Sequence, residues 1–557
     1  MNSDSGKPEA LNNLSRRGFL RGVGAIGGAA AVTGLGSSAM ADCALGGTPQ
    51  ERRSASFQAR IDAAKAARQG IVTQTCNGDE DLYPNRIGNY SKGLPHDELG
   101  EVDAAAYESM LTALASGNPA DFDAITLGLG RKLTNPQAGL AFDLQGSDSH
   151  RLTQPPAPAF ASAKAAGEIT ENYWMALLRD VPFADYETDS LAAAAAADLT
   201  NKSDYDWPTE SGVVTPATLF RGNSPGDLIG PYISQFLYLP APFGANYVSQ
   251  LMQTPVANVD FMTNFADWLT VQNGGDTGAA LSFEANRRYI INGRDLSQWV
   301  HIDVLFQAYF HAMLMLLQPP SSSGDPHAGG LGCPLNPGNP YNSSPTQIGF
   351  GTFGGPHIAT LLCEVSTRAL KAVWYQKWFV HRRLRPEVFA ARVHNHVTGA
   401  ADYPIHSDIL NSPVLDEVFN RHGSYLLPMA FPEGSPTHPA YGAGHATVAG
   451  ACVTILKALF DENYVIPNPM VPDPSDPTQL VPYVGPALTV RNELNKLAAN
   501  VGVGRNIAGV HWRTDHLASL DLGEAVAISI LRDQRGTYNE NFGGFTFTKF
   551  DGSTVTV

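Results

Sequence analysis

The spacing of apolar residues in the second half of the chain is that of α-helices. Apolar side chains recur every three or four positions over residues 357–384, 444–460, 489–506 and 511–532, which places them on one face of a helix. Strand patterns are sparse, and only the alternation within residues 537–557 predicts a small hairpin. Helices in the first half are expected over residues 57–69, 104–116, 161–179, 191–199, 256–271, 281–291 and, as one long apolar helix, 296–317. The chain is therefore expected to be mostly α.

A segment rich in Pro, Ser and Gly, residues 318–355, interrupts the helical pattern. We interpret it as a loop between two helical halves, because such residues favour turns over regular structure. No repeat of 20–50 residues is apparent. The expected parts are a targeting segment (1–41), an N-terminal helical part (42–320), the loop (321–356), a C-terminal helical bundle (357–536) and a tail (537–557).

The N-terminus has the features of an export signal. Arg16 and Arg17 form a twin-arginine signature, an apolar stretch rich in Gly and Ala follows over residues 22–38, and residues 39–41 read Ala-Met-Ala, a cleavage site of the A-x-A type. We expect export by the twin-arginine route to the periplasm or the extracellular space, without a membrane anchor.

The charge balance excludes some classes of partner. The formal net charge is -16 at pH 7, so nucleic acid and anionic membranes are not expected partners. A local cluster of basic residues in such an acidic chain is therefore informative, because those residues must be concentrated for a reason. The five cysteines show no CxxC spacing, which disfavours zinc and iron–sulfur sites. Cys43 and Cys76 are the expected disulfide pair, and Cys363 and Cys452 are expected in the core.

Three polar stretches carry the chemistry, and the first precedes a proline. Trp374, Lys377, His381 and Arg385 are three or four residues apart, so a helix would carry them on one side. Pro386 disfavours the helical conformation in the residue before it, and Arg385 is expected to leave the end of the helix. The alternative is that this basic cluster only complements the negative end of the helix dipole.

The second stretch is a glycine-rich turn between two histidines, His438 and His445. Gly442 and Gly444 permit a tight turn and a close approach of backbone to a ligand. A helix that starts near His445 directs free N–H groups at the same place. The alternative, an ordinary turn before a helix, does not account for a histidine on each side.

The third stretch contains Arg505 and His511, which one straight helix cannot direct to the same place because they are six residues apart. Gly509 between them indicates a break that lets them converge. Asp515 follows His511 by one turn and is expected to fix the imidazole tautomer. Together the stretches supply the cations, N–H groups and imidazoles that bind a tetrahedral oxyanion.

This order of motifs, Lys-x7-Arg-Pro, then Gly-His, then Arg-x5-His-x3-Asp, resembles the vanadium-dependent haloperoxidases. That family shares its fold and anion site with acid phosphatases of the type 2 phosphatidic acid phosphatase superfamily. The resemblance is strongest to the algal bromoperoxidase branch and covers about residues 210–535. It implies a helical-bundle architecture with long loops and little β. The segments that carry it are residues 353–357, 374–378, 381–387 and 509–513.

The resemblance also implies a vanadate cofactor and a ligand set for it. His511 would bind the vanadium through an imidazole nitrogen. Lys377, Arg385 and Arg505 would neutralise the vanadate oxygens, with the N–H of Gly444. A structural calcium ion occurs in some relatives, but its ligands are not identified in this sequence. Assembly into a homo-oligomer is expected.

The implied reaction is the oxidation of bromide or iodide by hydrogen peroxide to hypohalous acid, which halogenates small organic acceptors. His445 would act as acid and base, Lys377 would polarise the bound peroxide, and His438 would be the second active-site histidine. Trp374 and His438 would line the side that receives the halide. In this family the bound metal is a Lewis acid and keeps its oxidation state.

Two alternatives use the same anion site. A secreted acid phosphatase would use His511 as the nucleophile of a phospho-histidine and His445 as the acid, although such phosphatases space their Lys and Arg by six residues rather than seven. The second alternative is a protein that binds an oxyanion without catalysing a reaction. The family usually has Pro-Ser-Gly-His, whose Ser donates to the oxyanion, and Ala443 in the corresponding place lacks a donor.

Overall fold

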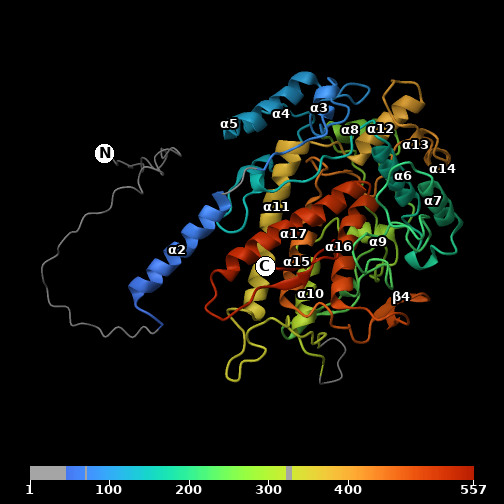
Figure 1. The fold of residues 1–557 in the computed structure, drawn as a ribbon. Helices are drawn as coiled ribbons and strands as arrows, with labels where there is room; N and C mark the ends of the chain where they lie inside the picture. Colours follow the sequence, from blue (N-terminus) through green and yellow to red (C-terminus); the bar gives the residue numbers. More distant parts are fainter. Residues whose placement is uncertain (1–45, 69–71, 322–328) are drawn as a thin grey trace, which may run out of the picture. The chain divides into compact units, whose positions relative to one another are not determined.

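The computed structural model describes residues 46–68, 72–321 and 329–557. The chain divides into two compact units, residues 1–58 and 59–557. Residues 46–58, the described part of the first unit, contain the start of a helix with exposed side chains. The second unit is mostly helical, as expected, and its strands form two-stranded antiparallel hairpins (Figure 1). The expected targeting segment and Cys43 lie outside the described residues.

Helices form most of the regular structure, and short hairpins make up the rest. The α-helices are α2 (Pro49–Arg68), α3 (Asp79–Leu82), α4 (Ala104–Ser116), α5 (Pro119–Asp123), α6 (Ala163–Leu177), α7 (Ser190–Thr200), α8 (Phe265–Gln272), α9 (Gly293–Trp299), α10 (Gln307–Leu317), α11 (Gly355–Tyr375), α12 (Pro386–Val397), α13 (Ser407–Leu410), α14 (Val414–His422), α15 (Gly444–Leu459), α16 (Val490–Ile507) and α17 (Arg513–Arg535). The 3-10 turns are η2 (Pro136–Leu140), η3 (Ser149–Arg151), η4 (Phe183–Asp185) and η5 (Gln235–Leu237), and η6 (Gln376–His381) is a π-helix. The hairpins pair β1 (Ala241–Phe243) with β2 (Asn246–Val248), β3 (Met470–Asp473) with β4 (Asp476–Pro482), and β5 (Thr546–Thr548) with β6 (Thr554–Thr556).

Helix α15 is the centre of the bundle and packs against α11, α16 and α17 (Figure 1). All of its residues except His445 are buried, which is the pattern of a core helix that is apolar on every side. Two glycines let α15 and α17 approach closely. A Cβ atom on Gly450 would lie 2.2 Å from the Leu520 carbonyl oxygen, and one on Gly523 would lie 2.0 Å from that of Thr447. None of the helices in the described part of the chain combines the length and apolarity needed to cross a membrane.

The helix expected over residues 357–384 ends as the proline predicts. Helix α11 passes directly into the π-helix η6, and Arg382 then turns the chain with a φ of 39°. Arg385 is extended, with φ −84° and ψ 156°, and Pro386 begins α12. The guanidinium of Arg385 therefore leaves from the junction of two helices. The expected hairpin near the C-terminus is also confirmed, as β5 and β6.

Three expected helices are wrong in whole or in part. Residues 296–317 are not one helix, because α9 ends at Trp299 and α10 starts at Gln307. Residues 281–291 are not helical, since their backbone pairs with residues 252–255 through isolated bridges. Of residues 256–271 only the part within α8 is helical. In each case a tertiary partner competes with local helix propensity and prevails.

The cysteine expectations are partly met. Cys452 is buried in α15 as expected, and Cys363 in α11 is only half-buried. Cys76 is exposed. Its expected disulfide with Cys43 stays a prediction, because Cys43 lies outside the described residues. Helices α12 and α14 and the hairpin of β3 and β4 were not expected from the sequence.

Candidate active site

Lys377 lies fully buried on the π-helix η6. Its Nζ donates to the carbonyl oxygens of Pro439 at 2.7 Å and Ala440 at 3.0 Å. These bonds join the first polar stretch to the second. Burial lowers the pKa of Lys377 well below its ordinary value, and the neighbouring Arg385 lowers it further. A π-turn often occurs at functional sites, and here it carries this lysine.

Arg385 links the three polar stretches. Its Nε donates to the backbone oxygen of His438 at 3.0 Å, and its Nη2 donates to the Nδ1 atom of that residue at 2.9 Å. Its Nη1 contacts the Val510 carbonyl oxygen at 2.6 Å and the Nε2 atom of His511 at 3.0 Å. Burial lowers the pKa of Arg385 to about 10. Because a guanidinium can only donate, both imidazole atoms that it contacts must be acceptors.

His511 is held by a carboxylate on its other side. Its Nδ1 lies 2.8 Å from Asp515 Oδ2, so the Nδ1 atom carries the proton and the Nε2 atom keeps its lone pair. Burial lowers the pKa of His511 well below its ordinary value, and the cations of Arg385 and Lys377 lower it further. Burial raises the pKa of Asp515 to about 6, against the attraction of Arg383. The imidazole is thus neutral and oriented.

Arg505 reaches the site from the last turn of α16, and His511 follows the break that the sequence indicates. Helix α16 ends at Ile507, Gly509 has a φ of 85°, and α17 starts after His511. The Nη1 atom of Arg505 donates to the Val300 carbonyl oxygen at 2.9 Å, but its buried Nε has no hydrogen-bond partner among the described residues. Burial lowers the pKa of Arg505 to about 10.

The N-terminus of α15 contributes Gly444 and His445. Gly444 is the first helical residue, so the N–H groups of this turn have no acceptor within the helix. His445 Nε2 lies 3.0 Å from Asp303 Oδ1, and the Asp303 side chain is 4% exposed. Burial raises the pKa of Asp303, but the attraction of His445 and Arg505 outweighs it and holds the pKa below its ordinary value. Asp303 therefore orients His445.

Sequence reasoning missed Asp303. It lies in the break between α9 and α10, where a single apolar helix was expected. The polar pair His301 and Asp303 in an otherwise apolar segment was the available signal. His301 has a similar tertiary partner, since its Nε2 lies 2.6 Å from Glu433 Oε1.

Trp374 forms a wall beside the same groups. The Trp374 ring centroid lies 4.8 Å from the His438 ring centroid. The Nζ atom of Lys377 lies 5.7 Å from the Trp374 ring centroid. A Cβ atom on Gly444 would lie 3.2 Å from the indole. Burial lowers the pKa of His438 well below its ordinary value, with Lys377 and Arg385 adding to the effect. Since His438 Nδ1 accepts from Arg385, the neutral ring carries its proton on Nε2.

Other basic residues of the first stretch have separate roles. Arg382 pairs with Glu80, and Arg383 binds Glu168 at 2.8 Å and Asp515 at 3.0 Å. Arg383 thereby supports the carboxylate that orients His511, a role that the sequence did not reveal. His381 packs edge-on against Tyr441, and burial lowers its pKa to about 3. The helix-dipole alternative does not describe these contacts.

The charge balance of the site shows what it can bind. Lys377, Arg385 and Arg505 have no carboxylate within 4.0 Å among the described residues, whereas many buried basic residues elsewhere in that part of the chain are paired. Examples are Lys92 with Glu387, Lys202 with Asp198, and Arg513 with Glu171. Three buried basic groups without counter-ions are costly unless an anion joins them. An anion would also raise their lowered pKa values. The residues present thus fit a tetrahedral oxyanion.

Ala443 precedes α15 and has no side-chain oxygen. Its backbone N–H donates to the hydroxyl oxygen of Ser519 at 2.8 Å, and Ser519 is fully buried on α17. The sequence analysis did not identify Ser519 as part of the site.

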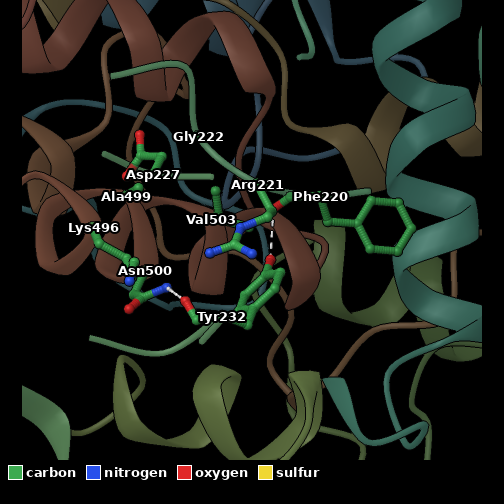
Figure 2. Close-up of a pocket in the computed structure, with 9 residues that line it drawn as sticks. All are labelled: Phe220, Arg221, Gly222, Asp227, Tyr232, Lys496, Ala499, Asn500 and Val503. Atoms are coloured by element: carbon green, nitrogen blue, oxygen red, sulfur yellow. Dashed lines mark hydrogen bonds between the residues drawn. The ribbon is translucent and has the colours of Figure 1, made fainter. Parts of the chain in front are cut away.

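A second pocket lies between α16 and the preceding loops, and Figure 2 shows the side chains around it. It has room for about one water molecule. Burial raises the pKa of Asp227 there to about 7, and the Oδ1 atom of Asp227 has no partner among the described residues. Lys496 lines this pocket. It lies on the same helix as Arg505, about 13 Å before it along the helix axis. The pocket is too small for substrate chemistry.

The cationic cluster differs from a metal site built of carboxylate and cysteine ligands, because it offers mainly positive charge together with imidazole lone pairs. Across residues 46–68, 72–321 and 329–557, no three or more His, Cys, Asp or Glu side chains form a group suited to a metal ion. We therefore assign no calcium ligands.

Comparison with known proteins gives consistent matches. The family described as the VCPO second helical-bundle domain matches residues 365–539. The chain is 36% identical to a vanadium-dependent bromoperoxidase of Corallina pilulifera, over 91% of this chain and 99% of that protein. It is 34% identical to a vanadium-dependent bromoperoxidase of Ascophyllum nodosum, over 91% of this chain and 92% of that protein.

A solved structure is similar over almost the whole chain. It is the homohexameric structure of a vanadate-dependent bromoperoxidase from Ascophyllum nodosum. The TM-score is 0.85, the sequence identity is 30%, and the alignment covers 94% of each chain. The similarity therefore extends well beyond residues 210–535, to which the motifs alone point.

Proposed function

Because the chain belongs to the family of vanadium-dependent bromoperoxidases, we propose that its buried cationic site holds vanadate and oxidises bromide and iodide with hydrogen peroxide. The observation that carries the proposal is the set of three buried basic groups without carboxylate partners, beside a neutral imidazole whose Nε2 lone pair faces a cation. Vanadate when bound supplies a Lewis acid that activates hydrogen peroxide toward attack by a halide.

Each residue of the site has a place in holding the anion. His511 would offer its Nε2 lone pair to the vanadium, and Asp515 keeps the proton on Nδ1. Lys377, Arg385 and Arg505 would neutralise the oxygens, and the Gly444 N–H would donate to one of them. These groups already lie together, so binding would need only local changes, such as the exchange of the Arg385 contact with His511 Nε2 for a contact with an oxygen of the anion.

The reaction needs a proton acceptor and donor beside the oxyanion. His445 would take a proton from hydrogen peroxide, and Asp303 would stabilise the resulting imidazolium through Nε2. When bromide takes up one peroxide oxygen, His445 would return its proton to the other oxygen, which leaves as water. The net change is one hydrogen peroxide, one bromide and one proton giving hypobromous acid and water. Lys377 polarises the oxygen that is attacked.

The halide approaches on the side of Trp374 and His438, which lie against each other. We expect bromide and iodide to be good substrates and chloride a poor one, since chloride is the hardest of the three to oxidise. The hypohalous acid halogenates small organic acceptors.

The other candidate for this fold is an acid phosphatase with His511 as the nucleophile. One experiment separates the two. Apo-protein is reconstituted with orthovanadate and assayed for bromide oxidation, while hydrolysis of p-nitrophenyl phosphate is assayed in parallel. Bromide oxidation that requires vanadate, together with slow phosphatase turnover, supports the proposal. Phosphate in excess should slow vanadate uptake, because both anions need the same cations. Phosphatase activity without vanadate-dependent bromide oxidation would contradict the proposal.

Location and assembly complete the proposal. The twin-arginine signature of residues 15–21 supports export to the periplasm or beyond. Assembly into a homo-oligomer is proposed because a relative that is similar over 94% of the chain is homohexameric. Size-exclusion chromatography with light scattering tests the second point.

A further inference from the structure

The start of α15 is held from outside the helix. Several other helices in the described part of the chain follow a residue whose side-chain oxygen accepts from a first-turn N–H, for example Asp103, Ser162 and Thr489. Ala443 stands in that place before α15 and offers no oxygen. The free N–H groups of the first turn are therefore left for a ligand instead of a cap.

Ser519 takes over the second hydrogen bond of a usual helix cap, the one that accepts the N–H of the residue before the helix. In a capping box, a side chain three residues into the helix accepts the N–H of the residue that precedes the helix. Ala446 occupies that position and cannot accept. Instead the Ser519 hydroxyl oxygen, buried on α17, accepts the Ala443 N–H at 2.8 Å. The turn is thus fixed without using the N–H groups that face the site.

One further hydrogen bond holds the Ser519 hydroxyl in place, and a glycine leaves room for it. Gln154 Nε2 donates to it at 3.2 Å. Gly442 leaves room for both side chains, since a Cβ atom there would lie 2.4 Å from Ser519 Oγ and 2.6 Å from Gln154 Oε1. The glycine of the turn and the serine of α17 therefore depend on each other.

We propose that Ser519 is a positioning residue that directs the first-turn N–H groups of α15, that of Gly444 above all, at the bound oxyanion. Ser519 follows Asp515 by one turn on the same helix, so both lie on one face of α17. That face orients the His511 imidazole through Asp515 and the oxyanion N–H groups through Ser519. The inference rests on the proposed function, because it assigns these N–H groups to vanadate.

The test compares Ser519→Ala with Ser529→Ala as a matched control. Ser529 is also a buried serine of α17, and its hydroxyl bonds Val526 and Ser147 instead of the active-site turn. Apo-protein of each variant is titrated with orthovanadate by equilibrium dialysis. Steady-state kinetics at saturating vanadate then give the KM for bromide, and the thermal midpoint of each apo-protein is measured.

Ser519→Ala should weaken vanadate binding about three- to tenfold, the loss expected for one backbone hydrogen bond, with the KM for bromide within twofold of the wild type. Gly442→Ala, which displaces the Ser519 hydroxyl, should weaken binding in the same direction. The Ser529→Ala control should bind vanadate as the wild type does.

Vanadate affinity of Ser519→Ala equal to that of the control would overturn the inference and leave the proposed function intact. A matching rise in the KM for bromide would overturn it too, since that pattern means general loosening of the site. Failure of the wild-type protein to bind orthovanadate would instead count against the proposed function itself.

Discussion

The Nη1 atom of Arg385 lies 3.0 Å from the Nε2 atom of His511 and donates to its lone pair. Asp515 binds the opposite nitrogen at 2.8 Å. The imidazole is therefore held at both ends, by a carboxylate and a cation. A vanadium atom held by Nε2 would take the place of this Arg385 hydrogen, and the guanidinium would then be free to donate to an oxygen of the anion.

Asp515→Asn should weaken vanadate retention by about ten- to a hundredfold, the usual cost of losing a partner behind a metal-binding histidine. An amide can donate to Nδ1 and so favour the wrong tautomer of His511. Vanadium content after dialysis, measured by elemental analysis, checks this. Asp521→Asn, on the same helix and away from the imidazole, is the control. Full retention in Asp515→Asn would show that the carboxylate does not set the tautomer.

Lys377→Met and Lys92→Met should have opposite effects on stability and on vanadate binding. Both lysines are fully buried, but Lys92 pairs with Glu387 at 2.7 Å, whereas Lys377 has no carboxylate within 4.0 Å in the described part of the chain. Removing Lys92 leaves a buried carboxylate without its partner and should cost about 3–5 kcal/mol of stability.

Lys377→Met should cost the apo-protein less than Lys92→Met, because an unfavourably buried charge is lost. Vanadate binding should fail in Lys377→Met alone. Chemical denaturation of both apo-proteins and titration with orthovanadate test the pair. Equal destabilisation by the two substitutions would contradict the charge balance described for the site.

Asp303→Asn should lower kcat for bromide oxidation by about tenfold or more, within the range that positioned acid–base groups contribute. The amide keeps an acceptor for His445 Nε2 but removes the negative charge that favours the imidazolium. Vanadium content should stay close to that of the wild type. Turnover that is unchanged between pH 5 and 8 would exclude this role for Asp303.

Asp227→Asn should change how stability depends on pH. Burial raises the pKa of Asp227 to about 7, from an ordinary value near 3.8, although Arg221 and Lys496 oppose the shift and Glu493 adds to it. Between pH 4 and 7 the folded protein keeps a proton that the unfolded chain has lost, so stability falls as pH rises through this window.

The asparagine variant does not lose stability in this way, so between pH 4 and 7 its free energy of unfolding should rise relative to that of the wild type. At about 1.4 kcal/mol for each pKa unit, the gain amounts to up to a few kcal/mol. Above pH 7 the difference should stay constant. Thermal midpoints of both proteins at pH 5 and pH 8 give the comparison. The same change in midpoint for both proteins would mean that Asp227 titrates normally.

Gly450→Ala should destabilise the bundle by about 3 kcal/mol or more, at the upper end of overpacking effects. The added Cβ atom meets the Leu520 backbone, 2.2 Å away, which cannot move as a side chain can. Gly351→Ala is the control, since a Cβ atom there meets nothing within 4 Å. Denaturant midpoints report the difference, and a mild effect of Gly450→Ala would show that α15 and α17 can separate.

Much of the bundle could be predicted because its signals are local. Apolar spacing is complete within each of α15, α16 and α17, and their bounds fall within three residues of the expected ones. Pro386 and Gly509 act on their own backbone or that of a neighbour, so the exit of Arg385 and the break after α16 also follow from sequence. The segments at 281–291 and 296–317 did not follow, because distant partners decide their backbone.

The sequence by itself determined which residue types the site contains and in what order, since Lys377, Arg385, His438, His445, Arg505 and His511 stand in recognisable spacings. Only the tertiary structure decided how they are held. Asp303 reaches His445 from a break in an expected helix, Arg383 supports Asp515 across 132 residues, and Ser519 holds Ala443 across 76. These contacts join residues far apart in the chain, and hydrogen bonds between such residues have no period or spacing that a sequence pattern could carry.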